Sequence, residues 1–330
     1  MPNILVTGGA GFIGSHFILH LHRAYPNYTI INLDKLTYAA NLGYLESIAH
    51  SPRYRFVKGD IADAGLVKDL FRTYSPEGVI HFAAESHVDN SIQGPGIFVQ
   101  TNVLGTQVLL EQARRSWKKP YRFLHVSTDE VYGSLGDTGY FTEESPLKPN
   151  SPYSASKASS DLLVRSYYHT YGMNLTITRC TNNYGPHQHD EKLIPTIIRN
   201  AIQNKPIPIY GSGQNTRDWL YVTDHCHAID LVFQNGQSGE VYNIGSNCEW
   251  RNIDLAKTIC KVLKRPESLI QSVDDRLGHD FRYALDVSKI RNQLKWISQT
   301  SFEAGLEQTI AWYLRKYSGM LNREREYGVT

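Results

Sequence analysis

The segment TGGAGFIG constrains the fold of this chain more than any other part of the sequence. Gly8, Gly11 and Gly14 form a G-x-x-G-x-x-G pattern that follows a short apolar run and opens a helical pattern. Glycine lets the chain turn tightly here and lets the backbone approach a pyrophosphate, whose charge the amino end of the helix stabilises. The segment therefore predicts a strand, a turn and a helix around a phosphate group.

Short β-branched runs alternate with amphipathic stretches through the first half of the chain. This rhythm indicates parallel βαβ units and an α/β fold with a Rossmann-type doubly wound parallel sheet. The expected strands are 3–7, 28–33, 54–57, 78–84, 122–127 and 174–179, and the expected helices are 12–23, 65–74, 98–116 and 153–171.

The pattern changes after Arg179, where segments rich in proline and glycine separate shorter elements. We expect residues 1–179, joined by parts of 221–251, to form a Rossmann domain around the glycine segment. Residues 180–330 should form mainly a smaller, interlocked domain for the substrate, and the polar end 321–330 should be frayed or disordered. The elements expected in this second part are helices at 192–203, 223–235, 253–264 and 302–316 and strands at 207–210 and 241–244.

Composition excludes several classes of function. The 330 residues carry a net charge of +2, so no basic excess indicates nucleic acid or an anionic membrane as a partner. No run of about 18 apolar residues occurs and no secretory signal pattern opens the chain, so we expect a cytoplasmic protein.

The four cysteines form no C-x-x-C pair. We expect no metal, because five histidines that invite one follow no recognised ligand order: His81, His87, His187, His189 and His279.

Asp34 closes the expected second strand, 20 positions after Gly14. An acidic side chain there accepts hydrogen bonds from the adenosine ribose hydroxyls and would repel a 2′-phosphate. Alone it would be an ordinary polar strand end, but together with the glycine segment it predicts NAD rather than NADP. Further residues expected at the cofactor are Phe12, Ile13, Lys35, Thr37, Asp60, Ile61, Ala83 and Ala84.

Tyr153 and Lys157, in YSASK, lie four residues apart and therefore on one face of a helix. An ammonium group near a phenol lowers the pKa of the phenol, so Tyr153 would act as a base toward a substrate hydroxyl. A tyrosine and a lysine at this spacing are usually a surface pair. The nucleotide-binding pattern that precedes them favours the catalytic interpretation.

Six motifs follow one another across nearly the whole chain: TGGAGFIG, Asp34, GDI, FAAESHVD, YSASK and NNYGP. In this order they resemble the extended short-chain dehydrogenase/reductase family, which implies a Rossmann fold and NAD. The family has a serine or threonine that polarises the substrate hydroxyl, and Thr128 stands 25 positions before Tyr153 in the matching place. The resemblance also implies that Thr101 and Asn183 lie near NAD.

Within this family, the sequence is most similar to nucleotide-sugar 4,6-dehydratases, those that act on dTDP-glucose above all. The similarity rests on STDEVYG at 127–133, SHVDNSI at 86–92, RCTNNYGP at 179–186, EKLIP at 191–195, TRDWLYVTDH at 216–225 and DRLGHDFRYALD at 275–286. A nucleotide-sugar 4-epimerase or decarboxylase shares the glycine segment and the tyrosine, but is expected to differ at position 129. Asp129 followed by Glu130 is therefore the feature that separates these activities.

The resemblance implies a role for each acidic side chain. Tyr153 would remove the C4 hydroxyl proton, Glu130 the C5 proton, and Asp129 would protonate the departing C6 hydroxyl to give a 4-keto-6-deoxy sugar nucleotide. Adjacent carboxylates raise each other's pKa, so one can stay protonated as the acid while the other is the base. NAD would be reduced and reoxidised within one turnover and so remain bound.

Arg217 is the expected ligand of the substrate diphosphate, because its planar fork matches phosphate oxygens. Without the family resemblance, an ion pair with the adjacent Asp218 is equally plausible. Leu277 and His189 depart from the family pattern, which affects loop shape rather than chemistry. The remaining residues that the resemblance places at the sugar nucleotide are Ser86, Asn182, Lys192, Leu193, Asn252, Arg276 and His279.

Several alternatives stay open. UDP-glucose dehydratases share STDEVYG, so the nucleobase is not determined, and neither is the deoxysugar pathway, for example that of rhamnose. A protein of another class, an NAD-binding regulator without activity, would tolerate loss of Thr128, Tyr153 or Lys157, and all three are present.

The helices at 98–116 and 153–171 carry apolar residues on more than one face. In relatives the matching helices pair into a four-helix bundle, so we expect a homodimer.

Overall fold

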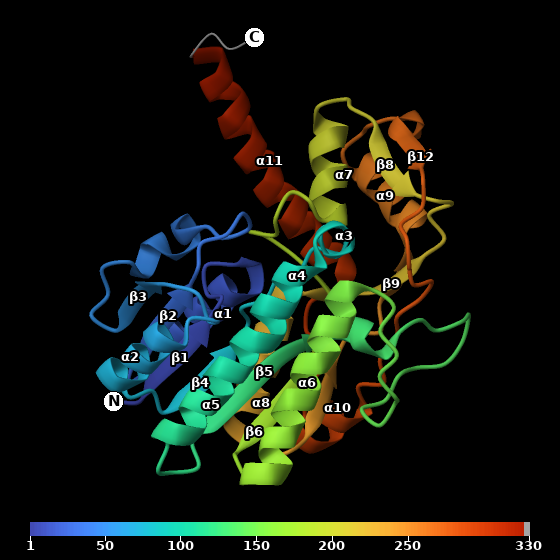
Figure 1. The fold of residues 1–330 in the computed structure, drawn as a ribbon. Helices are drawn as coiled ribbons and strands as arrows, with labels where there is room; N and C mark the ends of the chain where they lie inside the picture. Colours follow the sequence, from blue (N-terminus) through green and yellow to red (C-terminus); the bar gives the residue numbers. More distant parts are fainter. Residues whose placement is uncertain (327–330) are drawn as a thin grey trace.

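The computed structural model describes residues 1–326, which build one large parallel sheet with helices on both faces and a smaller region beside it (Figure 1). Seven strands form the sheet in the order β10-β6-β5-β4-β1-β2-β3, and all neighbours run parallel. The predicted Rossmann-type doubly wound sheet is confirmed. Its strands are β1 (Asn3–Thr7), β2 (Thr29–Asp34), β3 (Tyr54–Lys58), β4 (Gly78–His81), β5 (Arg122–Thr128), β6 (Leu175–Cys180) and β10 (Val241–Ile244).

Helices cover both faces of this sheet. On one face α1 (Phe12–Ala24) packs against α8 (Val222–Asn235); on the other α2 (Ala64–Tyr74), α5 (Thr106–Ser116) and α6 (Pro152–Tyr171) lie in a row. Each face has its own apolar core, because strands buried on both sides present apolar residues in both directions. Both α8 and β10 come from the second half of the chain, so the chain returns to the large sheet after leaving it.

The smaller region has a third apolar core. It contains a three-stranded sheet in the order β11-β9-β7 and a two-stranded sheet of β12 and β8. Its elements are β7 (Asn182–Tyr184), α7 (Leu193–Ile202), β8 (Ile207–Tyr210), β9 (Thr216–Tyr221), β11 (Glu249–Arg251), α9 (Asn252–Val262), η4 (Glu267–Leu269), β12 (Ile270–Val273) and α11 (Phe302–Glu326).

One expected helix is interrupted. The segment predicted at 98–116 begins as α4 (Pro95–Phe98), continues as a π-helix, η2 (Val99–Gly105), and only then becomes α5. The carbonyl of Asn102 accepts hydrogen bonds from the hydroxyls of Thr106 and Ser160, both at 2.6 Å, which supports the wider turn. π-Helical segments are rare and often occur at functional sites.

Other elements were not expected from the sequence. Short strands with mixed polarity carry little periodic signal, which explains why β7, β9, β11 and β12 were missed. The helix predicted at 302–316 continues to Glu326 through most of the polar end expected to be frayed, and 327–330 lie outside the described residues. The remaining missed elements are η1 (Leu42–Ile48), α3 (Val88–Gln93), η3 (Asp129–Tyr132) and α10 (Ser288–Leu294).

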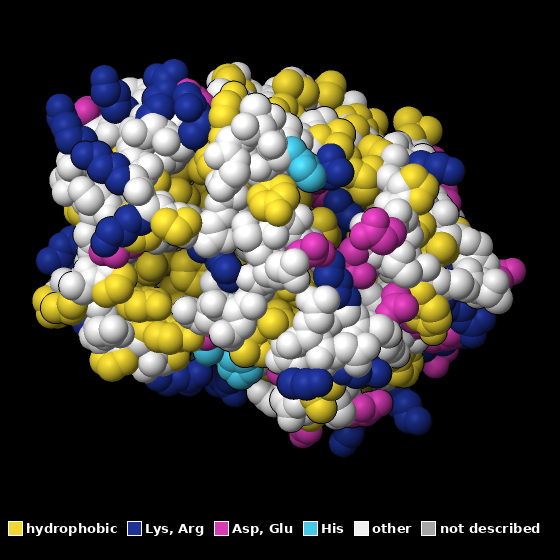
Figure 2. All heavy atoms as spheres, turned by 90° about the horizontal axis from the view of Figure 1, so that it is seen from below, with side chains coloured by type: hydrophobic (Ala, Val, Ile, Leu, Met, Phe, Trp, Pro, Cys, Tyr) yellow, Lys and Arg dark blue, Asp and Glu magenta, His cyan; other side chains and the backbone are white. Residues whose placement is uncertain are grey.

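The surface carries both signs of charge. Figure 2 shows one face, on which basic side chains gather at the upper left and acidic, basic and apolar side chains are mixed elsewhere. Within residues 1–326, no helix is long and apolar enough to cross a membrane.

Candidate active site

The glycine segment forms a tight turn between β1 and α1. Gly8 has φ +71°, and a Cβ there would lie 2.6 Å from the backbone nitrogen of Ala83, so no other residue fits without a shift. A Cβ at Gly14 would lie 2.3 Å from the carbonyl oxygen of Gly8. At Gly11, which caps α1, a Cβ would meet only that same oxygen, at 3.3 Å, so a side chain would enter the space before the helix. This space suits a phosphate group.

Asp34 ends β2 beside this turn and is 8% exposed. Its carboxylate accepts hydrogen bonds from the backbone N–H groups of Ala10, at 2.9 Å, and Leu36, at 2.8 Å. Burial raises its pKa, and both hydrogen bonds lower it in part. Nearby, Lys35 forms an ion pair with Asp60 at 2.8 Å. The carboxylate of Asp34 is thus fixed in direction by the backbone around it.

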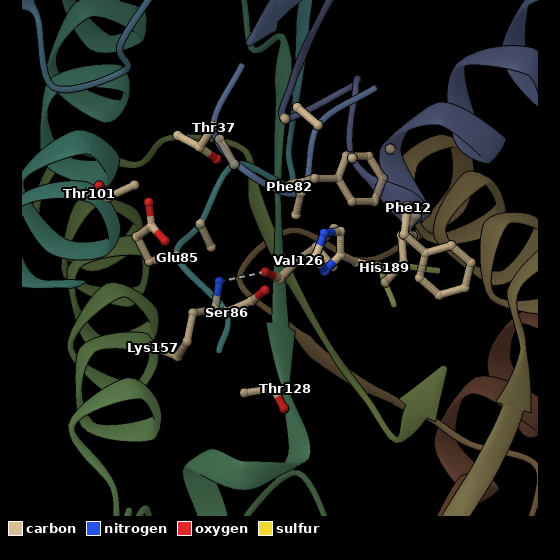
Figure 3. A pocket seen from close by; sticks show the side chains of 18 of the residues that line it. Phe12, Thr37, Phe82, Glu85, Ser86, Thr101, Val126, Thr128, Lys157 and His189 are labelled. Carbon is tan, nitrogen blue, oxygen red and sulfur yellow. Dashed lines mark hydrogen bonds between the residues drawn. The ribbon is translucent and has the colours of Figure 1, made fainter. Parts of the chain in front are cut away.

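A cavity of about 320 Å³ runs along the carboxyl ends of the sheet strands. It extends from the glycine segment to Thr128, Tyr153 and Lys157, and Figure 3 shows Thr128 and Lys157 in it on different elements. In parallel α/β sheets ligands bind at this edge, where the strand order reverses. The two groups of residues that the sequence suggested for cofactor and catalysis therefore share one cavity.

Local structure explains why polar residues follow the apolar strand β5. The hydroxyl of Thr128 accepts a hydrogen bond from the N–H of Glu130, at 3.3 Å, and thereby caps the short 3₁₀-helix η3. The same hydroxyl donates to Asp129 Oδ1 at 3.2 Å. Asp129 is 2% exposed, and its Oδ2 has no hydrogen-bond partner within the described chain. A buried carboxyl oxygen without a partner favours the protonated form.

The two adjacent carboxyl groups differ in their surroundings. Burial, and then the charge of Glu130, raise the pKa of Asp129 well above its usual value. Burial also raises the pKa of Glu130, but the positive charges of Arg217, Lys192 and Arg276 lower it in part. The pKa of Asp129 is therefore raised more strongly, so Asp129 is the group of the pair that more readily keeps its proton.

Tyr153 and Lys157 lie on the face of α6 that points to the cavity, and both are buried. The ammonium of Lys157 donates to the carbonyl of Val126 at 2.8 Å (Figure 3). Burial lowers the pKa of Lys157 to about 8, although Asp161 raises it in part. Burial and then Glu130 raise the pKa of Tyr153 well above its usual value. The sequence predicted that Lys157 would lower this pKa, but the pKa is raised, and burial is the largest cause.

A buried ionic network lies behind Lys157. Asp161, one helical turn further along α6, accepts a hydrogen bond from Arg179 Nε at 2.8 Å, and His125 Nε2 lies 3.4 Å from its other oxygen. Arg179 also donates to the hydroxyl of Tyr132 at 2.8 Å. Although burial raises it, Arg179 and His125 lower the pKa of Asp161 to about 2. A negative charge therefore stays close to the lysine.

Comparison with known proteins shows the family. The family model for GDP-mannose 4,6 dehydratase matches residues 5–309. The chain belongs to this dehydratase family. A dTDP-glucose 4,6-dehydratase of Xanthomonas campestris pv. campestris is 51% identical, over 95% of this chain and 93% of that protein. The resemblance found in the sequence is thereby confirmed.

Solved structures of the dehydratase family and of epimerases have the same fold. A dTDP-glucose 4,6-dehydratase of Streptomyces venezuelae, solved with NAD and a dTDP ligand, has a TM-score of 0.92 and 50% identity, over 96% of this chain and 98% of that one. A UDP-glucose 4-epimerase of Thermotoga maritima, solved with UDP-glucose, has a TM-score of 0.88 and 29% identity, over 96% and 99%. The two activities thus share one scaffold.

Most residues that the sequence suggested for this dehydratase site line the cavity, and their individual roles stay predictions. They are Gly8, Gly11, Phe12, Ile13, Gly14, Asp34, Lys35, Thr37, Asp60, Ile61, Ala83, Ala84, Ser86, Thr101, Thr128, Asp129, Glu130, Tyr153, Lys157, Asn182, Asn183 and Lys192.

Five suggested substrate residues do not line the cavity: Leu193, Arg217, Asn252, Arg276 and His279. The guanidinium of Arg217 donates to the carbonyls of Thr216, Phe281 and Asp280 at 2.8 to 3.2 Å. The alternative ion pair with Asp218 does not form, since Asp218 instead accepts hydrogen bonds from Ser246 and Cys248.

The other four belong to the second half of the chain. Arg276 forms a bidentate pair with Asp89, at 2.6 and 2.9 Å, and His279 bonds Asp275 at 2.6 Å. Leu193 and Asn252 begin α7 and α9. Arg217 and Arg276 still act on Glu130 through their charge, because both lower its pKa.

Sequence reasoning missed Asn102, which joins three parts of the site. Its side chain accepts from the N–H of Glu85, at 2.8 Å, and donates to the carbonyl of Glu85 and the hydroxyl of Ser156, at 3.0 and 2.8 Å. It thus holds the loop after β4 against α6. An asparagine in an apolar helical pattern was the available signal. Other missed cavity residues include Phe82, Glu85, Gln188, His189 and Glu191.

Proposed function

We propose that this chain is a dTDP-glucose 4,6-dehydratase, which uses NAD to form dTDP-4-keto-6-deoxyglucose and water. The observation that carries the proposal is the convergence of Asp129 and Glu130 with Thr128, Tyr153 and Lys157 in one cavity. Oxidation of C4 makes the C5 proton acidic, and loss of the C6 hydroxyl then needs one base and one acid beyond the tyrosine. The dTDP-glucose 4,6-dehydratases at about half identity support the same activity.

The chain's own residues account for each proton. Tyr153 accepts the C4 hydroxyl proton, while the Thr128 hydroxyl orients that group and Lys157 supplies nearby positive charge. Glu130 is the C5 base: burial raises its pKa, but three positive groups lower it in part, so it loses its proton more readily than Asp129. Asp129 is the acid for the C6 oxygen, since burial and Glu130 favour its protonated form. Adjacent positions on η3 thereby hold an acid and a base together.

The cofactor end of the cavity fits NAD. The glycine turn leaves space before α1, and the Asp34 carboxylate stands at the end of β2 where a ribose would lie and a 2′-phosphate would be repelled. When bound, NAD supplies a hydride acceptor and donor and a positive charge that favours the phenolate form of Tyr153.

A substrate comparison tests the proposed function. The purified protein, incubated separately with dTDP-glucose, UDP-glucose and GDP-mannose, is expected to give the alkali-induced absorbance of a 4-keto-6-deoxy product with dTDP-glucose. Product from UDP-glucose alone would favour the UDP-glucose dehydratase alternative. Interconversion at C4 without that absorbance would favour an epimerase, and bound NAD with no product from any sugar would favour the regulator.

Glu130→Gln separates elimination from oxidation. Because the amide cannot accept the C5 proton, we expect this variant to form bound NADH from substrate but to incorporate no solvent deuterium at C5. Glu144→Gln, on an exposed loop residue outside the cavity, is the matched control and should incorporate deuterium normally. Normal incorporation in Glu130→Gln would show that another residue is the base.

A homodimer through a four-helix bundle is also part of this proposal. The segment α4-η2-α5 lies beside α6 on the outer face of the sheet (Figure 1). Both carry large apolar side chains that are exposed in the single chain: Ile97, Val99, Leu104 and Leu162. Exposed apolar side chains grouped in this way favour burial against a second copy. A monomeric mass by sedimentation equilibrium would contradict this part of the proposal.

A further inference from the structure

Two loops that are far apart in the sequence meet at the cavity. Residues 35–41 follow β2, and residues 185–192 follow β7. Both loops contribute to the cavity lining, the first with Thr37, Ala39 and Ala40 and the second with Gln188, His189, Glu191 and Lys192. Figure 3 shows Thr37 and His189 among the side chains around the cavity. A ligand held by the glycine segment therefore has both loops beside it.

The loops touch through three side chains, Tyr38, His189 and Glu191, which we call the latch. The hydroxyl of Tyr38 donates to Glu191 Oε1 at 3.2 Å. The ring of Tyr38 meets the ring of His189 edge to face, with centroids 5.4 Å apart. His189 Nδ1 lies 3.5 Å from Glu191 Oε2, so the two residues of the second loop also contact each other. The latch thus combines a hydrogen bond with an aromatic contact.

Positive and polar neighbours keep the Glu191 carboxylate in place. His87 Nε2 and Lys192 Nζ lie 3.7 and 3.9 Å from its oxygens. Although burial raises it, His189, Lys192 and His87 lower the pKa of Glu191 overall. The carboxylate therefore remains ionised and able to accept the hydrogen bond from Tyr38.

The second loop is anchored behind the latch. His187, at φ +71°, stacks on Tyr44 with centroids 4.0 Å apart and rings 4° from parallel. The His187 ring also stacks on the ring of His16 and contacts the ring of Trp312 edge to face. His16 also hydrogen-bonds the carbonyl of Pro186, at 2.9 Å. By contrast, the Tyr38 side chain is 46% exposed, so it can turn away from the second loop into solvent.

We propose that Tyr38, His189 and Glu191 retain the dinucleotide, which leaves the cavity only after Tyr38 separates from the other two. This inference rests on the proposed function, because it assumes that NAD occupies the cavity. A dehydratase that takes a hydride from its substrate and returns it to the same molecule needs no cofactor exchange. Slow release is therefore compatible with turnover, and a closed latch keeps the cofactor loaded.

The rate of NAD release from the holoenzyme tests the latch. The protein is loaded with radiolabelled NAD and chased with excess unlabelled NAD, and bound label is followed over time. Tyr38→Ala removes both contacts and is expected to release NAD about tenfold faster than the wild type. Tyr38→Phe keeps the ring but loses the hydrogen bond, and Glu191→Gln removes the carboxylate charge while an amide oxygen stays as acceptor, so each is expected to accelerate release by about threefold.

Tyr140→Ala is the matched control, because Tyr140 is also exposed, at 56%, but does not line the cavity. It should release NAD at the wild-type rate. Unchanged release in all three latch variants would overturn the inference. A wild-type protein that binds no labelled NAD would instead contradict the proposed function, so the two failures are distinguishable. Thermal unfolding of each variant shows whether the protein remains folded.

Discussion

Tyr153→Phe is expected to lower kcat about a thousandfold, because the phenyl ring cannot accept the C4 hydroxyl proton. The side chain is 8% exposed and lines the cavity together with Thr128 and Lys157. Since proton removal accompanies oxidation, bound NADH should not accumulate when substrate is added. Stopped-flow absorbance of the reduced cofactor measures this step directly.

Tyr167→Phe is the matched control for this variant. Tyr167 lies on the same helix and is equally buried, but its hydroxyl donates to Glu111 on the outer face, at 3.3 Å. We expect wild-type NADH formation in this control. If Tyr153→Phe reduced NAD as fast as the wild type, the tyrosine would have no part in oxidation, while the role of Glu130 would remain open to its own test.

Asp161→Asn is expected to lower the free energy of unfolding by about 3 to 5 kcal/mol, because it leaves the buried Arg179 without its negative partner. Both side chains are almost inaccessible, at 1% and 6% exposure, so water cannot replace the lost charge. Urea unfolding measures the change. Asp69→Asn, which removes an exposed partner of Arg72, should change stability by less than about 0.5 kcal/mol.

The same residue predicts a pH dependence. The pKa of Asp161 is about 2 in the folded protein and lies near 4 in an unfolded chain. Because the folded pKa is the lower one, its contribution to stability is present above about pH 4 and is lost as the pH falls toward 2. Wild-type stability should therefore fall more steeply in this range than that of Asp161→Asn. Parallel acid-unfolding curves for the two proteins would contradict the assignment.

The activity of Asp161→Asn should also change with pH. Burial lowers the pKa of Lys157 to about 8. Asp161 and, to a smaller extent, Cys180 on β6 raise this pKa in part. Without the carboxylate, Lys157 should lose its proton at a lower pH, so the alkaline decline of kcat/KM should begin earlier. An unchanged alkaline limb would show that Asp161 serves stability alone.

The sequence predicted the parts of the fold that depend on local pattern. The glycine segment and Asp34 marked the turn after β1 and the end of β2, and regular alternation marked the strands of the large sheet. The cavity could be anticipated as well, because residues at the carboxyl ends of parallel strands must lie on one edge. Family resemblance then added Thr128, Asp129 and Glu130, which local pattern alone would have placed in a solvated turn.

What could not be predicted depends on contacts between distant segments. The three side-chain hydrogen bonds of Asn102 join a loop and two helices. The hydrogen bond between Tyr38 and Glu191 joins residues that lie 153 positions apart in the sequence. The pKa of Tyr153 was predicted in the wrong direction, because spacing on a helix shows which charge is near but not how deeply both groups are buried. The π-helix η2 has no recognisable sequence signal.

The return of the chain to the large sheet through α8 and β10 means that the protein cannot be divided by a single cut. A fragment ending at residue 179 would lack the strand that pairs with β6 and the helix that packs on α1. The bare edge of β6 and an uncovered apolar face would then be free to pair with other chains, so aggregation is expected. Replacing either part by a module from another protein through a single gene fusion would likewise break the large sheet.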